Sequence, residues 1–404
     1  MKKTMKKLAA VFSVIALMMM LLISGAAAEA AGVFYQADEM FSDRDMKQTA
    51  DLAEAVTYAL ADGQDIRITA AGVYVLTGKA ANVTVYVEAG KDDKVQIVLD
   101  GVTVANAAFP VIYVKSADKV FVTTSADSAL SVTGTFASDG SVKTDGVIFS
   151  KSDLVLSGTA ALTVTSTDNG IVCKDDLKIT GGTYSISASS KAVEANDSIR
   201  IADGALYLAA GTDGLHAEND KDDTKGYVYI AGGTITIQAG DDGIHATSVV
   251  QIDGGTLTVK AAEGIEGTYI QINGGIVNIQ STDDGINAAQ KSKAYTATVE
   301  INDGDITIAM GAGDTDGVDS NGNIIVNGGT VSVTGSSTFD YDGTAQYNGG
   351  TIIANGQQIS YIPNQMMGGW GGMNGGWGNN DFGRGNTNSG WGGMGNGRGG
   401  RGGW

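Results

Sequence analysis

One stretch decides the fold: Ala231-Gly-Gly-Thr-Ile-Thr-Ile237, which leads into Asp241-Asp-Gly-Ile-His-Ala246. The first of these segments recurs as Asp253-Gly-Gly-Thr-Leu-Thr-Val259 and as Asn273-Gly-Gly-Ile-Val-Asn-Ile279, and the second recurs as Asp283-Asp-Gly-Ile-Asn-Ala288. Glycine pairs or Asp-Gly steps recur every 20 to 29 residues, and their second glycines are Gly182, Gly204, Gly233, Gly255, Gly275, Gly304, Gly329 and Gly350. A unit of this length that repeats with occasional insertions is typical of a solenoid.

Within each unit, apolar residues alternate with polar ones. In the stretch 256–261, Leu257 and Val259 share one side of the chain, and Thr256 and Thr258 share the other. A period of two is the period of a strand, whereas a helix needs 3.6. Glycine pairs and Asp-Gly turns supply the positive φ angles between strands. The pattern predicts an all-β solenoid in which each strand pairs with its equivalent in the next coil, about 4.8 Å away.

Equivalent positions of successive coils then form columns. An apolar column should point inward: Ile171, Val193, Leu215, Ile244, Ile265, Ile286 and Val318. A column of small residues should also point inward: Cys173, Ala195, Ala217, Ala246, Gly267, Ala288 and Ser320. The polar residues between these columns should point outward: Glu194, His216, His245, Glu266, Asn287 and Asp319. Cys173 is the only cysteine, so we predict a buried core residue rather than a reactive thiol.

The chain divides into four parts. Residues 1–30 have the pattern of a secretory signal, with four lysines, an apolar run and Ala26-Ala-Ala28 for cleavage, so we expect a secreted protein without a membrane segment after cleavage. Residues 31–94 are less regular and are predicted to be a β cap. Residues 95–362 are the solenoid, with about 11 coils. Residues 363–404 hold all four tryptophans and are predicted to be a disordered Gly-rich tail, with the cell wall as one potential partner.

The charge of the chain excludes nucleic acid as a partner bound by electrostatics. The formal net charge is −19, and removal of the four lysines and Glu29 within residues 1–30 leaves 22 basic and 44 acidic residues. Such a surface suits divalent cations or neutral partners. Two insertions, 218–226 and 289–296, interrupt the period at the same corner of the coil, and such loops often form the binding side of a solenoid.

A column of carboxylates precedes the Gly-Ile steps. Aligning the coils on this step gives Asp145, Asn169, Lys191, Asp213, Asp242, Glu263, Asp284, Asp316 and Asp342. Carboxylates stacked about 4.8 Å apart repel one another, and Ca²⁺ with six to eight oxygen ligands would neutralise them. We therefore predict a calcium site drawn from Asp213, Asp241, Asp242, Glu263, Asp283, Asp284, Asp314, Asp316, Glu194 and Glu218. The alternative is that Asp before Gly serves the turn alone.

Outward polar residues are the candidates for sugar binding: Tyr207, His216, His245, Glu266, Asn287 and Asp319. Thr234, Thr236, Thr258 and Asn278 add hydrogen-bonding groups. His216 and His245 occupy equivalent positions in neighbouring coils, but a zinc pair lacks a cysteine or a third histidine. The pattern therefore favours histidines that flank a sugar groove.

Several phrases are similar to one known family. They are Asp145-Gly-Val-Ile-Phe-Ser-Lys-Ser-Asp-Leu154, Asn196-Asp-Ser-Ile-Arg-Ile-Ala-Asp-Gly204 and Asp213-Gly-Leu-His-Ala-Glu-Asn-Asp220. Between residues 40 and 359 the chain resembles the secreted carbohydrate-binding β-helix proteins of Gram-positive bacteria. The resemblance implies a right-handed parallel β-helix like that of pectate lyases, with bound Ca²⁺. It also implies binding to cellulose and to acidic polysaccharides such as pectin of the plant cell wall, without catalysis.

Two other functions remain open from the residues. A calcium-dependent polysaccharide lyase needs a base beside the metal, and Lys191 is the only basic residue of the carboxylate column, although a salt bridge to Asp213 would also explain it. An ice- or crystal-binding face would use Thr234, Thr236 and their neighbours, but the threonine ladder is interrupted in several coils.

Overall fold

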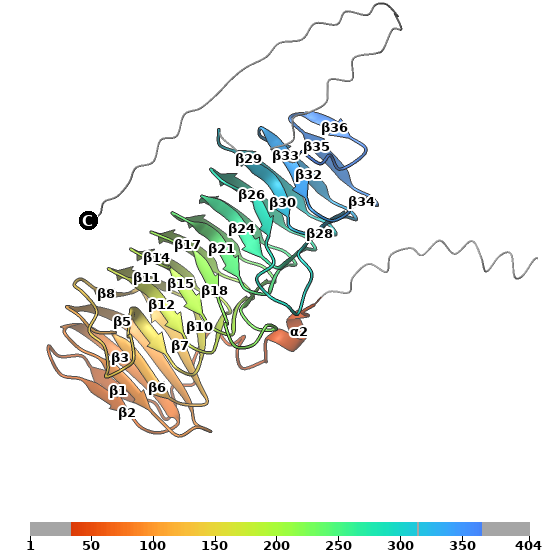
Figure 1. The fold of residues 1–404 in the computed structure, drawn as a ribbon. Coiled ribbons are helices and arrows are strands. Elements are labelled where there is room, and N and C mark those ends of the chain that lie inside the picture. Colours follow the sequence, from red (N-terminus) through yellow and green to blue (C-terminus); the bar gives the residue numbers. More distant parts are fainter. Residues whose placement is uncertain (1–33, 313–314, 366–404) are drawn as a thin grey trace, which may run out of the picture. The chain divides into compact units, whose positions relative to one another are not determined.

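The computed structural model describes residues 34–312 and 315–365 (Figure 1). In this part, strands alternate with turns almost throughout, and one short helix, α2 (Ala37–Met40), precedes the first strand. The predicted signal sequence, Asp314 and the predicted tail from residue 366 onward lie outside the described residues. Within the described residues, no helix is long and apolar enough to cross a membrane.

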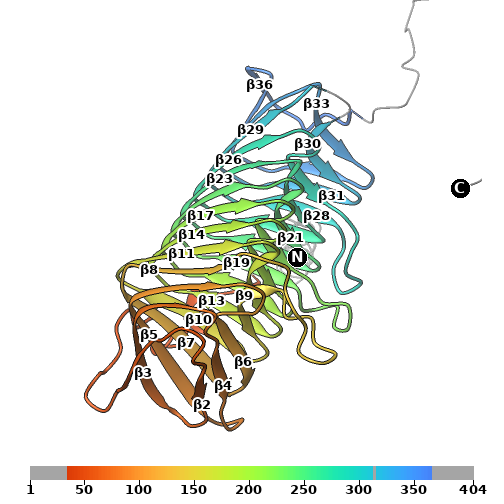
Figure 2. The same cartoon turned by 90° about the vertical axis from the view of Figure 1, so that its left-hand side faces the viewer.

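The strands stack coil upon coil, and each coil places one strand on each of three sides (Figure 2). One side is a 12-stranded parallel sheet, named sheet B. Its strands are β2 (Ile66–Ile68), β4 (Val85–Glu88), β6 (Ile112–Ser116), β9 (Gly146–Ser150), β12 (Asn169–Cys173), β15 (Val193–Ala195), β18 (Leu215–Ala217), β21 (Asp242–Ala246), β24 (Glu263–Gly267), β27 (Ile286–Ala288), β30 (Asp316–Ser320) and β33 (Ser337–Tyr341).

The other two sides belong to one 24-stranded sheet, because the long strands β3 (Gly72–Ala81) and β5 (Lys94–Asn106) extend along both; β1 (Val56–Ala59) pairs with β3. The strap side, named for the segment that covers it, contains β7 (Lys119–Ala126), β10 (Asp153–Gly158), β13 (Asp176–Ile179), β16 (Ser198–Ile201), β19 (Tyr227–Ile230), β22 (Val249–Ile252), β25 (Tyr269–Ile272), β28 (Thr298–Ile301), β31 (Asn323–Val326) and β34 (Ala345–Tyr347). The open side contains β8 (Ser128–Val132), β11 (Ala161–Ser166), β14 (Thr183–Ala188), β17 (Ala205–Ala210), β20 (Thr234–Gln238), β23 (Thr256–Ala261), β26 (Ile276–Ser281), β29 (Asp305–Met310), β32 (Thr330–Thr334), β35 (Thr351–Ala354) and β36 (Gln357–Ile359).

The predicted parallel β-helix is confirmed by the register of sheet B. Ile171 pairs with Val193, which pairs with Leu215, and the apolar column continues to Val318 with every member fully buried. The small-residue column also lies inside, and Cys173 is fully buried, as predicted. Stacking each strand on an equivalent strand buries a continuous apolar core along the coils.

The glycine pairs do two things at the corner before the open side. Gly255 has a φ of 86°, which disfavours any residue with a Cβ atom. A Cβ atom on Gly255 would also lie 2.6 Å from the carbonyl oxygen of Gly233 in the preceding coil. Neighbouring coils can therefore approach at strand spacing only if this corner lacks side chains.

The stack starts earlier than predicted. Residues 31–94 were expected to be a cap, but β2 and β4 already pair in parallel with one another and then with β6. Sheet B therefore has 12 strands, where about 11 coils were expected from residue 95 onward. The early coils lack the glycine pairs of the later ones, and a register shift between Thr77 and Lys79 hides their period.

The described chain begins with a segment that we name the strap, residues 34–48. It runs outside the stack along the strap side, where α2 lies beside strands far later in the sequence (Figure 1). Phe34 contacts Tyr269 and Tyr295, with ring centroids 4.8 and 5.5 Å away, and Gln48 bonds to residues of β10 and its neighbouring coil. The strap thus covers one of the three sides and leaves sheet B and the open side for ligands.

Candidate functional site

One outward column of sheet B collects the polar residues that the sequence placed together. The structure stacks Val172, Glu194, His216, His245, Glu266, Asn287, Asp319 and Asp340 in consecutive coils. The predicted register is therefore confirmed for all six polar members named from the sequence. Asp340 is a further member that the sequence alignment missed.

The neighbouring carboxylate column is also present in the structure, but the sequence alignment placed the wrong residue at each end of it. Lys191, Asp213, Asp242, Glu263, Asp284 and Asp316 follow one another in register. The partner of Asp316 is Ser337, so Asp342 is not a member. Asn169 pairs with Gly146, which moves Asp145 one residue out of register. Five consecutive coils, rather than six, carry a carboxylate here.

Part of this column serves the backbone. The Oδ1 atom of Asp213 accepts a hydrogen bond of 3.3 Å from the N–H of Asp242, and the Oδ1 atom of Asp284 accepts one of 3.0 Å from the N–H of Asp316. Each of these carboxylates therefore ties its corner to the next coil, as the turn-only alternative requires. Their second oxygens remain available for other partners.

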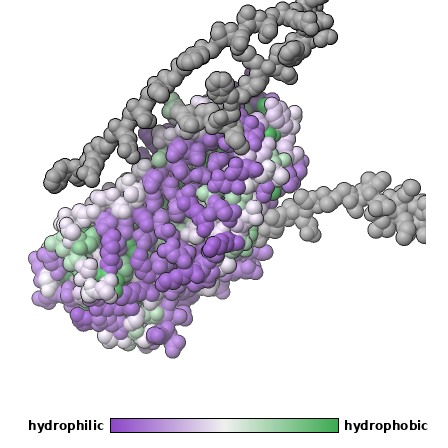
Figure 3. Space-filling view, viewed as in Figure 1, coloured by the Kyte–Doolittle hydropathy of each residue, from purple (hydrophilic) through white to green (hydrophobic). Residues whose placement is uncertain are grey.

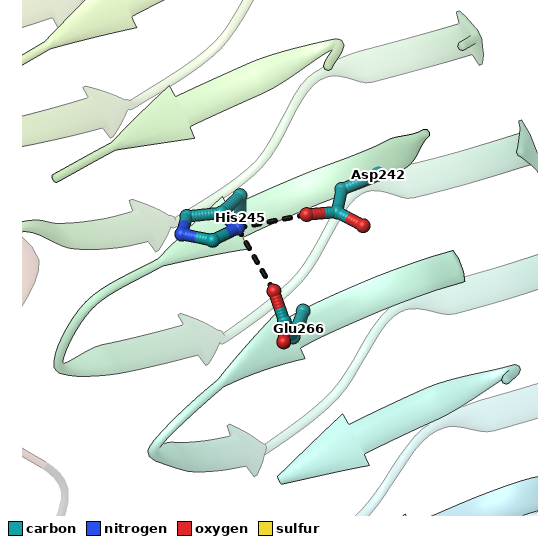
Figure 4. Close-up of side chains that lie close together, drawn as sticks. All are labelled: Asp242, His245 and Glu266. Atoms are coloured by element: carbon teal, nitrogen blue, oxygen red, sulfur yellow. Dashed lines mark hydrogen bonds and ion pairs between the residues drawn. The ribbon is translucent and has the colours of Figure 1, made fainter. Parts of the chain in front are cut away.

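At Asp242, a carboxylate oxygen contacts a histidine (Figure 4). His245 Nδ1 lies 2.7 Å from Asp242 Oδ2 and 2.9 Å from Glu266 Oε2, and these three atoms form a group able to hold a metal ion. Burial lowers the pKa of His245, but its hydrogen bonds to Asp242 and Glu266 outweigh burial and raise the pKa to about 9. His216 stacks on His245 with ring centroids 4.5 Å apart.

Lysines neutralise two acidic members of the outward column. Glu194 Oε1 lies 2.5 Å from Lys174 Nζ, and Glu194 Oε2 lies 3.6 Å from Lys191 Nζ. Glu266 Oε1 lies 2.9 Å from Lys291 Nζ, which comes from the second insertion. Glu194 therefore already has cationic partners, which weakens its predicted role as a metal ligand. These pairings could not be predicted from the sequence, since lysines at loop positions have no period.

The carboxylates near the end of the column lack such partners. No ion pair among residues 34–312 and 315–365 involves Asp284, Asp319 or Asp340. Burial raises the pKa of Asp319 to about 7, with further contributions from the charges of Asp284, Asp316 and Asp340. Burial and nearby carboxylates also raise the pKa of Asp284 to about 6. The Oδ1 atom of Asp340 is buried without a hydrogen-bond partner.

The two insertions form one wall beside sheet B. Ser292 Oγ of the second insertion donates a hydrogen bond of 2.6 Å to the carbonyl of Asp223 in the first. A cleft of about 530 Å³ opens between the first insertion and the outward column, and Glu194, His216 and Glu218 line it. Hydrophilic residues cover much of the surface that Figure 3 shows. The expectation that both loops lie on one side of the coils is confirmed.

The remaining predicted site residues are dispersed. Asp241 and Asp283 are exposed, and the side chain of Glu263 accepts a hydrogen bond of 3.1 Å from Asn287. Glu218 is exposed as well, but it lies 3.1 Å from His216 Nε2. Tyr207 does not lie near the histidines, because β17 belongs to the open side. There it is 52% exposed, in one column with Thr236, Thr258 and Asn278. The predicted sugar-binding residues therefore occupy two separate surfaces.

The open side is nearly free of charge. Its outward residues in the four central strands are Ala205, Tyr207, Ala209, Thr234, Thr236, Gln238, Thr256, Thr258, Lys260, Ile276, Asn278 and Gln280. Lys260 is the only charged residue among them, in a chain whose net charge is −19. Hydroxyls, amides and one exposed aromatic ring therefore dominate this surface.

The register and the core define a class: this is a parallel β-helix protein. Residues 62–317 match the family described as "Carbohydrate-binding domain-containing protein". Because this match covers more than half of the chain, the chain belongs to that family.

Two similar proteins are known. A "Carbohydrate-binding domain-containing protein" of Acetivibrio thermocellus is 32% identical over 130 residues, which are 31% of this chain and 46% of that protein. The chain thus matches less than half the length of this curated relative. A solved structure, "Structure of the polysaccharide lyase-like protein from C. thermocellum, Gadolinium derivative", has a TM-score of 0.49 and 31% identity and covers 55% of this chain and 96% of that chain.

Proposed function

We propose that this protein is a secreted, non-catalytic polysaccharide-binding protein that uses Ca²⁺ to bind acidic polymers. Membership of a carbohydrate-binding family supports the ligand class. The signal-like pattern of residues 1–30 supports export, and the plant cell wall is the proposed source of the polymer.

One observation carries the calcium proposal: the end of the polar columns collects carboxylates without cationic partners. Asp284, Asp319 and Asp340 come from three successive coils and raise one another's free energy by repulsion. Their oxygens are the donors that Ca²⁺ prefers. A bound Ca²⁺ would offset the repulsion and bridge to the carboxylates of a uronate chain, which the bare acidic surface would repel.

The open side is the proposed surface for neutral polysaccharides such as cellulose. It carries almost no charge, and its hydroxyl and amide groups suit the hydroxyls of sugars. Tyr207 offers an exposed ring for stacking on a pyranose. The strap covers the strap side from β10 to β25, so these strands are not open to a polymer.

Lys191 is a poor candidate for a catalytic base, which disfavours the lyase alternative. Its Nζ atom pairs with Glu194 at 3.6 Å, rather than with Asp213 as the sequence suggested. The amine that the lyase alternative needs as a base is therefore engaged by a carboxylate of the outward column. Absorbance from unsaturated product on pectate, with Ca²⁺ present, measures lyase activity directly, and we expect none.

Retention on insoluble polysaccharides tests the proposal. We expect retention on polygalacturonate that chelation of Ca²⁺ abolishes, and retention on cellulose that chelation leaves unchanged. The Asp319→Asn variant should lose retention on polygalacturonate. Asp203→Asn, at an exposed turn, should keep retention on both polymers. If neither polymer retains the wild-type protein, the proposal is wrong.

A further inference from the structure

The two histidines of the protein sit in a repeated motif. Asp213-Gly-Leu-His216 and Asp242-Gly-Ile-His245 occupy the same positions of adjacent coils, so each imidazole lies next to the carboxylate three residues before it. The rings stack at 4.5 Å with an interplanar angle of 17°. Stacking and burial fix both rings, since their side chains are only 8% and 12% exposed.

Four carboxylates surround these two imidazoles. Asp242 and Glu266 contact His245 Nδ1, while Asp213 and Glu218 lie 2.8 and 3.1 Å from the two ring nitrogens of His216. Among the lysines that the structure describes, Lys291 alone pairs with a member of this group. Even with both rings protonated, the negative charges outnumber the positive ones. A divalent cation would offset the excess.

A second observation concerns His216. This residue is 6% exposed, and its Nδ1 atom makes no hydrogen bond although Asp213 Oδ2 lies only 2.8 Å away. The two atoms approach one another without the alignment of a donor and an acceptor. Buried polar atoms normally have a partner, and here the nitrogen has only the ion-pair contact with Asp213, a geometry that a cation bound between the two atoms would also satisfy.

We propose that the histidine–carboxylate ladder binds a divalent transition-metal ion such as Zn²⁺. Asp242, His245 and Glu266 would be the ligands, and His216 with Asp213 the adjoining rung. Imidazole with carboxylate suits zinc, cobalt, nickel and copper, whereas Ca²⁺ prefers oxygen alone. The sequence has too few cysteines and histidines for a zinc site made of these residues alone, but the fold adds two carboxylates from different coils as ligands.

This site is separate from the proposed calcium site. The carboxylates proposed for Ca²⁺ are Asp284, Asp319 and Asp340, one or more coils further along sheet B than Glu266. The cleft that His216 and Glu218 line opens beside the adjoining rung. The polar columns would then bind two classes of cation. A transition-metal ion would bind where nitrogen and oxygen donors are mixed, and Ca²⁺ would bind in the later coils, where the donors are oxygens alone.

Metal titration of protein without an affinity tag tests this proposal independently of polysaccharide binding. Because the chain has only two histidines, imidazole signals in the Cu²⁺ electron paramagnetic resonance spectrum can come only from His216 and His245. We expect such signals, and visible absorption bands when Co²⁺ is added. Excess Ca²⁺ should not displace the Co²⁺.

Three variants locate the ion. His245→Ala and the more conservative His245→Gln should weaken Co²⁺ binding at least about tenfold. Asp319→Asn should bind Co²⁺ like the wild type, with circular dichroism as the check on folding. The proposal is overturned if the Cu²⁺ spectrum of the wild type lacks nitrogen coupling, if Ca²⁺ displaces Co²⁺, or if both His245 variants fold and bind Co²⁺ unchanged.

Discussion

The side-chain amide of Gln251 bonds both backbone groups of Tyr35, 216 residues earlier in the chain. Its Nε2 atom donates to the Tyr35 carbonyl at 2.8 Å, and the Tyr35 N–H donates to Oε1 at 2.9 Å. Gln48 repeats the arrangement at the other end of the strap, where it bonds the N–H of Gly158 and the carbonyl of Thr180. Each of these two side-chain amides thus donates one hydrogen bond to the backbone and accepts another, as the peptide group of a neighbouring strand would.

Replacing Gln251 by Ala should loosen the start of the strap. Gln251 is fully buried, so the variant would leave two backbone groups of Tyr35 without partners, each costing about 1–3 kcal/mol. We expect a lower melting temperature and faster proteolysis within residues 34–48. Gln358→Ala, at an exposed position, is the control. Equal proteolysis of the two variants would show that this contact does not hold the strap.

Asp45, in the middle of the strap, makes the free energy of unfolding depend on pH in the acidic range. Burial raises the pKa of Asp45, but its hydrogen bonds to Lys178 and Ser42 and the charge of Lys119 outweigh burial and lower the pKa to about 2. Because the folded pKa is below the unfolded value near 4, ionised Asp45 contributes about 2–3 kcal/mol above pH 4, which is lost as the pH falls through 2.

Asp45→Asn should remove this dependence. The variant should be less stable at neutral pH by about 3 kcal/mol, because it leaves the ammonium of Lys178, 9% exposed, without its charged partner. Its free energy of unfolding, from urea titrations at several pH values, should fall less than that of the wild type between about pH 4 and 2. Parallel curves would contradict the assignment.

A ladder of four asparagines and one aspartate ties five coils together. Asn348 donates to Asn327, Asn327 to Asn302, Asn302 to Asn273, and Asn273 to Asp253, with distances of 2.7 or 2.8 Å. Asn302→Ala should destabilise the protein by about 1–3 kcal/mol, because it interrupts the ladder in the middle. Asn321→Ala, at an exposed position outside the ladder, should have little effect in the same denaturation experiment. Similar losses for both variants would argue against the ladder.

The calcium proposal predicts a pH dependence of opposite sign to that of Asp45. The folded pKa of Asp319, about 7, is above the unfolded value, so its contribution is complete below about pH 4 and is lost as the pH rises through 7. Without Ca²⁺, the melting temperature should therefore fall between about pH 5 and 8, and Ca²⁺ should restore it most at the upper end.

Asp319→Asn tests the origin of that effect. The variant should show a smaller fall in melting temperature across this pH range, because the raised pKa of Asp284 still contributes to the fall, and it should gain little from Ca²⁺, as differential scanning fluorimetry would show. Asp203→Asn should behave as the wild type. A full calcium response in Asp319→Asn would place the ion elsewhere.

The periodic parts of the molecule could be predicted, and the parts held by single contacts could not. Leu257 and Val259 alternate with threonines, so the inward columns followed from a period of two and from the Gly-Ile steps. The strap has no period, and nothing in the sequence links Gln251 with Tyr35. The prediction for Asp342 was wrong because the coil of β33 has Ser337-Thr338 where the coils just before it have Asp-Gly or Glu-Gly. Asp342-Gly343, which was aligned in its place, belongs to the next corner of that coil. The pairing of His245 with Glu266 depends on side-chain direction, which spacing does not specify.

Tyr207 should be a determinant of binding to insoluble neutral glucan. It is the large aromatic side chain that the open side exposes, and removing a stacked ring from a binding surface commonly costs more than 1 kcal/mol. Tyr207→Ala should lower the affinity for microcrystalline cellulose about tenfold in depletion isotherms and leave calcium-dependent retention on polygalacturonate unchanged. Tyr361→Ala is the control, because Tyr361 is 63% exposed but lies beyond the last strand. An equal loss in both variants, or a loss on both polymers, would show that the open side is not a separate surface for neutral chains.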